Sequence, residues 1–284
     1  MHISTVGDIA PNPSPYTPPL GEIITVAHTK GGAGKTTLTF NLAYSLAGCG
    51  ARVLVVDLDQ QTGQSAFIGD HEVGSQRDVG AVLLGQASLD DAVIVAVHPN
   101  LDVLPADELS IGAAGEQIDD LDVSERFHDL FDEARKRWDI VLVDTAGYQS
   151  RLVSAALRRS NGVIVPMVPE AGPVTELPTI LNTIRAAAES YQQPEVYGVI
   201  KLRIWGSSVY RRVAEEQIKT ITDEYGVPLF RNKVPEDARF GEAHLVGLPV
   251  GAYQASARSA VAYRHVAYEL IQLRDWHFAV PDGL

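Results

Sequence analysis

The sequence predicts an α/β fold, a doubly wound and mostly parallel sheet flanked by helices on both faces. Short apolar runs alternate along the chain with segments of helical periodicity, as in strands joined by crossover helices. Several runs are continuously apolar, for example Val53-Leu54-Val55-Val56, and strands covered on both faces have this composition. Of the 284 residues, 45% are hydrophobic and 21% charged, so a sizeable core can form and global disorder is excluded.

The expected elements follow from these runs. Strands are expected at residues 23–27, 52–56, 101–104, 140–143, 163–167 and 196–200. Helices are expected near residues 35–48, 122–137, 151–160, 174–190, 208–223 and 257–274. Residues 1–20 carry five of the 16 prolines and little to bury, which predicts a flexible or partly extended arm. Residues 21–284 are predicted to form a single domain.

Composition also bears on partners and compartment. The formal net charge is −13, which taken whole argues against nucleic acid. Residues 201–284, however, hold 11 Lys and Arg against 10 Asp and Glu. If the protein binds a polyanion, we therefore expect the last third of the chain to contact it. A lone cysteine, Cys49, excludes an internal disulfide and a cysteine-ligated cluster. We find no apolar run of roughly 18–20 residues and no secretory signal pattern, so we expect a cytoplasmic protein with no membrane span.

The most informative stretch is a glycine-rich segment between an expected strand and an expected helix. The apolar strand at residues 23–27 leads into KGGAGKTT at residues 30–37. Glycines let backbone N–H groups point inward around phosphate oxygens, and the helix N-terminus adds partial positive charge. In such a loop Lys35 reaches the β- and γ-phosphates, and the Thr36 hydroxyl ligates Mg²⁺. The sequence therefore predicts a binding site for ATP and Mg²⁺.

Three carboxylates follow expected strands. Asp57 and Asp59 come after the strand at 52–56, and Asp144 follows the strand at 140–143. Ligands of open parallel sheets bind outside the carboxyl ends of the strands, so these side chains should converge on the glycine loop. A carboxylate there can hold Mg²⁺, and another can orient a water toward the γ-phosphate. Helix capping is the alternative role for any one of them taken alone.

These motifs resemble the ParA group of deviant Walker-type P-loop ATPases, which are relatives of MinD. The resemblance covers about residues 22–274. Its most specific feature is Lys30, an extra lysine at the start of the loop in a chain with only six lysines. Residues 57–61 resemble the family's Asp-x-Asp-Pro-Gln, with Gln60 in place of proline.

The resemblance implies roles for the residues that match the family's motifs. Lys30 would cross a dimer interface to the nucleotide of the partner subunit, Asp57 would be the catalytic carboxylate and Asp144 the Walker B acid near Mg²⁺. The catalytic residues would be Lys30, Lys35, Asp57 and Asp144. The Mg²⁺ ligands would be Thr36, Asp57 and Asp144. The nucleotide would lie on Lys30, Gly31, Gly32, Ala33, Gly34, Lys35, Thr36 and Thr37.

The last third continues the resemblance. Residues 234–243, VPEDARFGEA, are similar to the family segment Ile-Pro-Arg-Asn-x-Arg-x-x-Glu-Ala, which implies that Pro235 and Glu236 lie against the adenine base. A purely structural turn is the alternative. The family's ATP-bound dimers bind DNA through basic C-terminal residues, and the matching candidates here are Arg211, Arg212 and Arg239. Further candidates for that face are Lys201, Arg203, Lys219, Arg231 and Lys233. The alternative is that these are ordinary solvated charges with acidic partners.

The resemblance implies an ATP-dependent dimerising switch that would hydrolyse ATP slowly and drive partition or positioning of DNA. Its ATP-bound homodimer would bind non-specific DNA and so associate with the nucleoid, and a ParB-like or adaptor protein would stimulate hydrolysis. Positioning of a protein cargo, a MinD-like membrane-associated switch and a non-catalytic scaffold stay open as alternatives. A membrane switch would need a basic amphipathic C-terminal helix, whereas this chain ends in a short acidic segment that includes Trp276 and Phe278.

Overall fold

A seven-stranded sheet organises the part of the chain that the computed structural model describes, which is residues 21–59, 77–146, 150–188, 194–206 and 208–278. The strand order is β3-β4-β2-β5-β1-β6-β7. Only β3 runs antiparallel to its neighbour in this described sheet; the other pairs are parallel. The strands are β1 (Glu22–Val26), β2 (Val53–Leu58), β3 (Ile94–His98), β4 (Leu101–Leu104), β5 (Ile140–Thr145), β6 (Gly162–Met167) and β7 (Glu195–Lys201).

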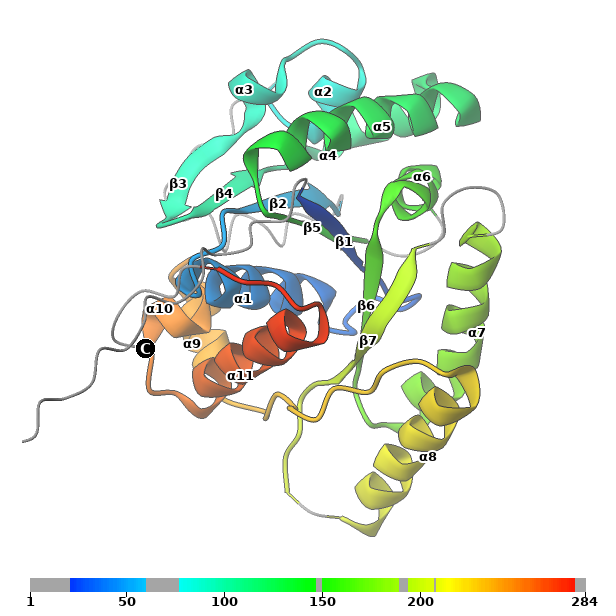
Figure 1. Cartoon of the computed structure of the whole chain (residues 1–284), viewed down its shortest axis with the longest axis vertical. Helices are drawn as coiled ribbons and strands as arrows, with labels where there is room; N and C mark the ends of the chain where they lie inside the picture. Colours follow the sequence, from blue (N-terminus) through cyan, green and yellow to red (C-terminus); the bar gives the residue numbers. More distant parts are fainter. Residues whose placement is uncertain (1–20, 60–76, 147–149, 189–193, 207, 279–284) are drawn as a thin grey trace, which may run out of the picture.

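Helices cover both faces of this sheet (Figure 1). α1, α9, α10 and α11 lie on one face, and the other helices lie on the opposite face. The helices are α1 (Lys35–Gly48), α2 (Val79–Leu83), α3 (Leu89–Ala92), α4 (Glu108–Gln117), α5 (Asp120–Arg137), α6 (Arg151–Arg159), α7 (Ala171–Ala188), α8 (Val209–Tyr225), α9 (Arg239–Leu245), α10 (Val250–Tyr253) and α11 (Arg258–Leu273).

Alternate residues of each central strand enter different cores. On β1, Ile24 packs into the core formed with α1 and α11, whereas its neighbour Ile23 packs into the core formed with α5. On β2, Val53 and Val55 pack on the α1 side and Leu54 on the α5 side. Period-two alternation therefore sends apolar side chains to both faces, and this explains why the strands are apolar without interruption.

The predicted fold class is confirmed, and each expected strand and helix is present with bounds shifted by a few residues. The structure adds elements that we did not expect, namely β3 and the short helices α2, α3, α4, α9 and α10. Several of these begin at a side-chain cap. The Asp78 carboxylate accepts hydrogen bonds from the backbone N–H groups of Gly80 and Ala81 at the start of α2. The predicted arm, residues 1–20, lies outside the described residues.

The contact between α2 and α4 yields a stability prediction. A Cβ atom at Gly80 would lie 2.5 Å from the backbone carbonyl carbon of Ser110 and 2.6 Å from the Ile111 nitrogen. Gly80→Ala should therefore force the two helices apart and lower the free energy of unfolding by about 1–3 kcal/mol. Gly112→Ala is the matched control on α4, because a Cβ there meets nothing within 4 Å; it should be neutral or stabilise by up to about 1 kcal/mol. Guanidinium unfolding of both variants measures the difference, and equal midpoints would contradict this prediction.

Candidate nucleotide-binding site

The carboxyl ends of three neighbouring strands carry the predicted site. In the parallel pairing of β2 with β5, Asp57 stands opposite Asp144. In the pairing of β1 with β5, Val26 stands opposite the same Asp144. The strand that leads into the glycine loop and the two acidic residues thus end side by side, as expected from the sequence.

The glycine loop encloses a cavity at this edge. Gly32 and Gly34 have φ angles of 72° and 87°, in the left-handed region that glycine adopts without a steric cost. A Cβ at Gly34 would also lie 2.9 Å from a methyl carbon of Leu202, which follows β7. The cavity has a volume of about 440 Å³. It is lined by Gly31, Gly32, Gly34, Lys35, Thr36, Thr37, Asp59, Ala146 and Arg203.

Two fully buried carboxylates lie beneath the loop. Asp57 Oδ1 accepts the backbone N–H of Asp59 at 2.7 Å, and Asp144 Oδ1 accepts the Thr39 hydroxyl at 3.3 Å. The Oδ2 atoms of both are buried and have no hydrogen-bond partner among the described residues. Burial raises the pKa of Asp144 to about 7. Burial first, and then the charge of Asp144, raise the pKa of Asp57 well above its ordinary value.

Unpartnered buried oxygens of this kind fit a bound cation. An ionised carboxylate without a partner is costly in the interior, and a divalent ion would supply the missing charge. Oxygen donors are the ligands that Mg²⁺ prefers. Thr36, the third predicted ligand, lies close enough to Asp144 to oppose the rise of its pKa. The residues present therefore fit the predicted Mg²⁺, with Asp57, Asp144 and Thr36 as the groups that would hold it.

Lys35 is folded back onto the loop. The residue is 5% exposed, and Nζ donates a hydrogen bond to the Lys30 carbonyl oxygen at 3.0 Å. Burial lowers the pKa of this ammonium group, while the charges of Asp144 and Asp59 oppose that shift. A cation held by one carbonyl at the wall of a cavity is suited to exchange that carbonyl for a phosphate oxygen.

The Lys30 side chain points toward α7 of the same subunit. Its Nζ forms an ion pair with Glu176 Oε1 on α7 at 2.6 Å. The adjacent Thr29 hydroxyl donates to Glu176 Oε2 at 3.2 Å. The Lys30 N–H donates to His28 Nδ1 at 3.0 Å. Neither Glu176 nor His28 was among the residues predicted for the site, since the sequence carried no signal for contacts made after folding.

Arg203 is a second residue whose place differs from expectation. The sequence groups it with the basic residues of a DNA-binding face, whereas in the structure it lines the loop cavity. Its φ of 54° lies in the left-handed region, where the chain turns after β7. The next residue, Ile204, pairs with Pro235 and accepts the backbone N–H of Glu236 at 2.9 Å. This pairing places the predicted adenine-contact segment beside Ile204, the residue that follows Arg203. Contact of Pro235 and Glu236 with a base stays a prediction.

The predicted DNA-binding residues require a correction. Arg211 is 8% exposed; its guanidinium donates to the Gly206 carbonyl oxygen at 2.9 Å and lies 4.9 Å from the centre of the Trp205 ring. A buried guanidinium with these contacts is not presented to a phosphate, so this structure does not favour the predicted role of Arg211. Arg239 is paired with the Glu242 carboxylate at 2.5 Å. Arg212 is exposed on α8.

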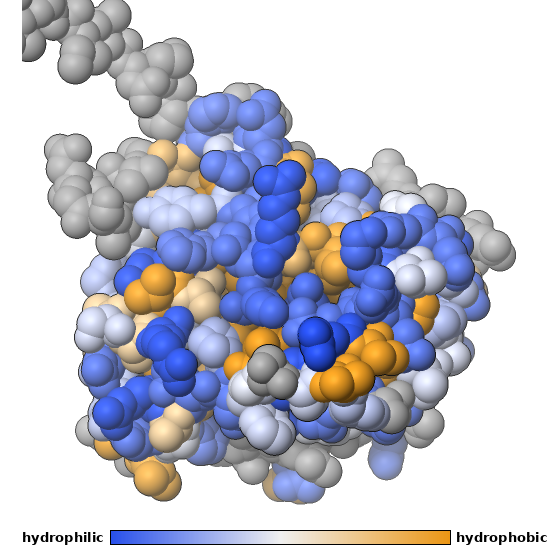
Figure 2. Space-filling view, turned by 90° about the horizontal axis from the view of Figure 1, so that it is seen from below, coloured by the Kyte–Doolittle hydropathy of each residue, from blue (hydrophilic) through white to orange (hydrophobic). Residues whose placement is uncertain are grey.

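The surface around the start of α8 is mixed in character. Trp205 and Val209 are each 68% exposed, and Tyr210 and Val213 are also exposed. This end of α8 is lowest in Figure 1 and faces the viewer in Figure 2, where apolar areas in orange lie among hydrophilic areas in blue. Acidic residues accompany the cations nearby: Glu215 pairs with Lys201 and Lys233, and Asp223 pairs with Lys219. The basic residues of the last third therefore do not form an uninterrupted cationic face.

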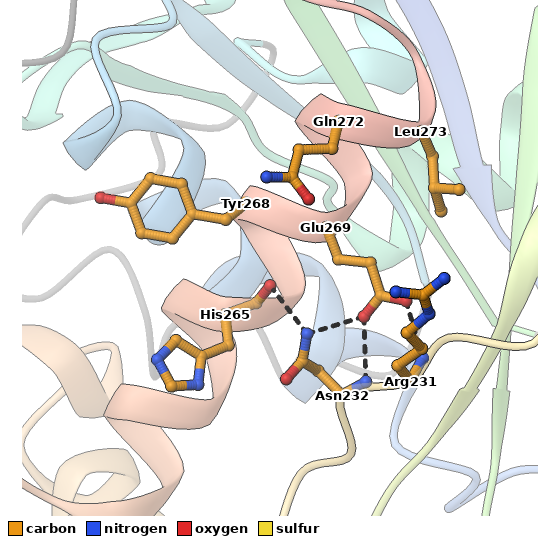
Figure 3. Close-up of a pocket in the computed structure, with 7 residues that line it drawn as sticks. All are labelled: Arg231, Asn232, His265, Tyr268, Glu269, Gln272 and Leu273. Carbon is orange, nitrogen blue, oxygen red and sulfur yellow. Dashed lines mark hydrogen bonds between the residues drawn. The ribbon is translucent and has the colours of Figure 1, made fainter.

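A second cavity of about 370 Å³ lies on the outer side of α11 and shares no lining residue with the loop cavity (Figure 3). The Glu269 carboxylate accepts the backbone N–H groups of Arg231 and Asn232 and the Asn232 side-chain amide, at 2.7–2.9 Å. His265 and Tyr268 point away from this group. The contacts of Glu269 tie the chain before α9 to α11, which is a structural role.

A strand, a glycine loop with left-handed turns and a helix, with buried carboxylates at the adjoining strand ends, define a phosphate-loop nucleotide-binding protein. A family profile described as an AAA domain matches residues 21–196. The chain belongs to the ParA/MinD family of P-loop ATPases, as the named relatives also indicate.

Two relatives and one solved structure illustrate the similarity. The chromosome partitioning protein ParA of Caulobacter vibrioides is 29% identical over 255 residues, which cover 88% of this chain and 93% of that protein. The sporulation initiation inhibitor protein Soj of Bacillus subtilis is 27% identical over 253 residues, covering 88% and 98%. The septum site-determining protein MinD of Pyrococcus horikoshii, complexed with Mg-ADP, superposes with a TM-score of 0.71 at 28% identity and covers 89% and 97% of the two chains.

The aromatic residues near the C-terminus are used within the fold. Trp276 is 5% exposed and belongs to the core around α1 and α11, and Phe278 packs against that core with its ring 6.0 Å from Trp276. Within the described ranges, every helix is too short or too polar to cross a membrane.

The raised pKa of Asp144 predicts a pH-dependent stability. A folded-state pKa of about 7 against an ordinary 3.8 means that the fold disfavours the charged form, so stability is lost as pH rises through this window. Asp144→Asn cannot ionise. Without nucleotide and with a chelator, the free energy of unfolding of the variant relative to wild type should increase by about 2–3 kcal/mol from pH 5 to pH 8 in guanidinium unfolding. Asp129→Asn, at an exposed position on α5, should show no such gain. An Asp144→Asn effect that is the same at both pH values would refute the assignment.

Proposed function

We propose that this protein is an ATP-dependent dimerising switch that hydrolyses ATP slowly and drives partition or positioning of DNA. The observation that carries the proposal is the pair of buried carboxylates, Asp57 and Asp144, with unpartnered oxygens beside a glycine loop. The relatives named for chromosome partitioning support the biological role.

Within one subunit, the backbone N–H groups of residues 31–37 bind the phosphates, and Lys35 moves from the Lys30 carbonyl to a phosphate oxygen. Asp57 orients the water that attacks the γ-phosphate. When bound, Mg²⁺ supplies neutralising charge on the β- and γ-phosphates. Arg203, at the cavity wall, adds a further positive charge on the side of β7. Turnover is slow because a switch that hydrolysed quickly would not persist in its bound state.

Between subunits, Lys30 of each crosses to the nucleotide of the other, and the closed dimer binds duplex DNA without sequence preference. Arg212 is the exposed candidate for phosphate contact, and Arg239 contributes where it leaves Glu242. A small number of contacts doubled by symmetry gives weak and strongly salt-dependent binding. A ParB-like or adaptor protein accelerates hydrolysis and so releases the dimer.

Positioning of a protein cargo is the second candidate. The exposed apolar residues at the start of α8, Trp205, Val209, Tyr210 and Val213, favour a protein contact there, because such side chains gather at interaction surfaces. A membrane-associated switch has less support, since Trp276 and Phe278 pack on the core.

The role of Asp57 is tested by Asp57→Ala. The variant should retain ATP-dependent dimerisation and lose turnover by at least about 100-fold, because a group that orients or activates the water contributes on that scale. Phosphate release and light scattering measure the two properties. Lys35→Ala is the comparison variant, in which nucleotide binding or hydrolysis itself should be lost. Normal turnover by Asp57→Ala would remove Asp57 from its catalytic role.

Mobility of random-sequence duplex DNA tests the function as a whole. Retention is expected with ATP and Mg²⁺ at low salt, and not with ADP or without nucleotide. Arg212→Ala should lower the slope of log affinity against log salt by about two for a dimer, while Arg126→Ala, an exposed arginine on α5, should leave it unchanged. A dimer that forms with ATP and never retards DNA would favour the protein-cargo function instead.

A further inference from the structure

We propose that Glu176 is a positioning residue that holds Lys30 within its own subunit and thereby sets the protein concentration at which ATP-bound subunits pair. The inference rests on the proposed dimerising function and identifies a contact that opposes dimerisation. It concerns the contact between the glycine loop and α7, which we call the Glu176 clasp: Thr29, Lys30 and Glu176.

The clasp has two points of attachment. One carboxylate oxygen of Glu176 pairs with the Lys30 ammonium at 2.6 Å, and the other accepts the Thr29 hydroxyl at 3.2 Å. The neighbouring residues Val174 and Leu177 of α7 are buried in the core, so the helix that presents the carboxylate is fixed. A Lys30 side chain bound in this way is directed to α7 of its own subunit and is not free to reach a second one.

The backbone of Lys30 is held independently of its side chain. Its N–H donates to His28 Nδ1 and its carbonyl accepts from Lys35 Nζ, both at 3.0 Å. His28 is 1% exposed, and burial, followed by the charge of Lys35, lowers its pKa to about 4. The imidazole is therefore neutral and accepts at Nδ1 throughout the physiological range. The backbone of Lys30 is thus held by contacts that do not involve Glu176, so its side chain can leave Glu176 without breaking them.

The clasp is weak enough to open. The side chains of Lys30 and Glu176 are 49% and 31% exposed, and exposed ion pairs change an equilibrium by up to about fivefold. A nucleotide triphosphate carries more negative charge than one carboxylate, so it outcompetes Glu176 for the ammonium when a second subunit brings it near. Glu176 therefore raises the threshold for pairing without preventing it.

Symmetry amplifies the effect. Both subunits must release Lys30 before the dimer closes, so the cost of the clasp enters the dimer dissociation constant twice. A factor of about three per subunit becomes about tenfold per dimer. Binding of nucleotide to a single subunit does not require Lys30 to cross. The Glu176–Lys30 contact should therefore not change the nucleotide affinity of the monomer.

The test compares Glu176→Gln with wild type in the presence of Mg²⁺ and a non-hydrolysable ATP analogue. The variant removes the charge that holds Lys30 and should lower the dimer dissociation constant about tenfold in analytical ultracentrifugation. Affinity for the analogue at dilutions where the protein is monomeric should stay within about twofold of wild type. Glu170→Gln is the matched control, since it removes an exposed carboxylate from the segment before α7. Thr29→Val, which removes one of the two attachments, should lie between wild type and Glu176→Gln.

The outcomes separate the clasp from the function on which it rests. If wild type dimerises and Glu176→Gln does so with the same constant, the clasp is overturned and the switch stands. If Glu176→Gln dimerises less readily, Glu176 supports the dimer, and the inference is equally refuted. If wild type stays monomeric with the analogue at every concentration, the proposed dimerising function itself fails.

Discussion

The rest of this site depends on the burial of two carboxylates at the ends of neighbouring parallel strands. The register of β2 and β5 sets Asp57 beside Asp144, and both are fully buried. Neither Oδ2 finds a hydrogen bond within the described residues, so ionising both would leave adjacent negative charges without compensation. Two cations, Lys35 on the loop and Arg203 after β7, line the cavity at this edge of the sheet. The geometry is one that a cation and a polyanion together would complete.

The cations of the loop already have partners inside the protein, and these partners are replaceable. Lys35 is bound to one backbone carbonyl, and Lys30 is bound to a partly exposed carboxylate. Each contact is a weaker version of the one that a phosphate would make. These contacts stabilise the loop when no ligand is bound. Breaking them when a ligand binds costs little free energy. A loop built in this way can change the contacts of its lysines while its backbone stays where His28 holds it.

In the last third of the chain, the number of charged residues does not predict which of them face solvent. Some of its cations are paired with anions of the same segment, such as Lys201 and Lys233 with Glu215. One cation that we placed on the surface is buried against Trp205, and another lines the cavity. Composition reports how many charges a segment has; it does not report which of them face solvent. The same segment exposes apolar side chains around the start of α8 (Figure 2), which a charge count does not report.

The sequence by itself determined the fold class, the positions of the main strands along the chain and the residues of the glycine loop, because periodicity and an eight-residue motif are local properties of the chain. It also placed Asp57 and Asp144 correctly, since the ends of parallel strands meet at one edge. It did not predict β3, whose five residues pair only at the sheet edge with β4. Tertiary structure alone decided the partners: Glu176 lies 147 residues from Thr29, and Arg211 is buried by its own neighbours. Contacts between residues so far apart depend on how helices pack, and no local pattern encodes that.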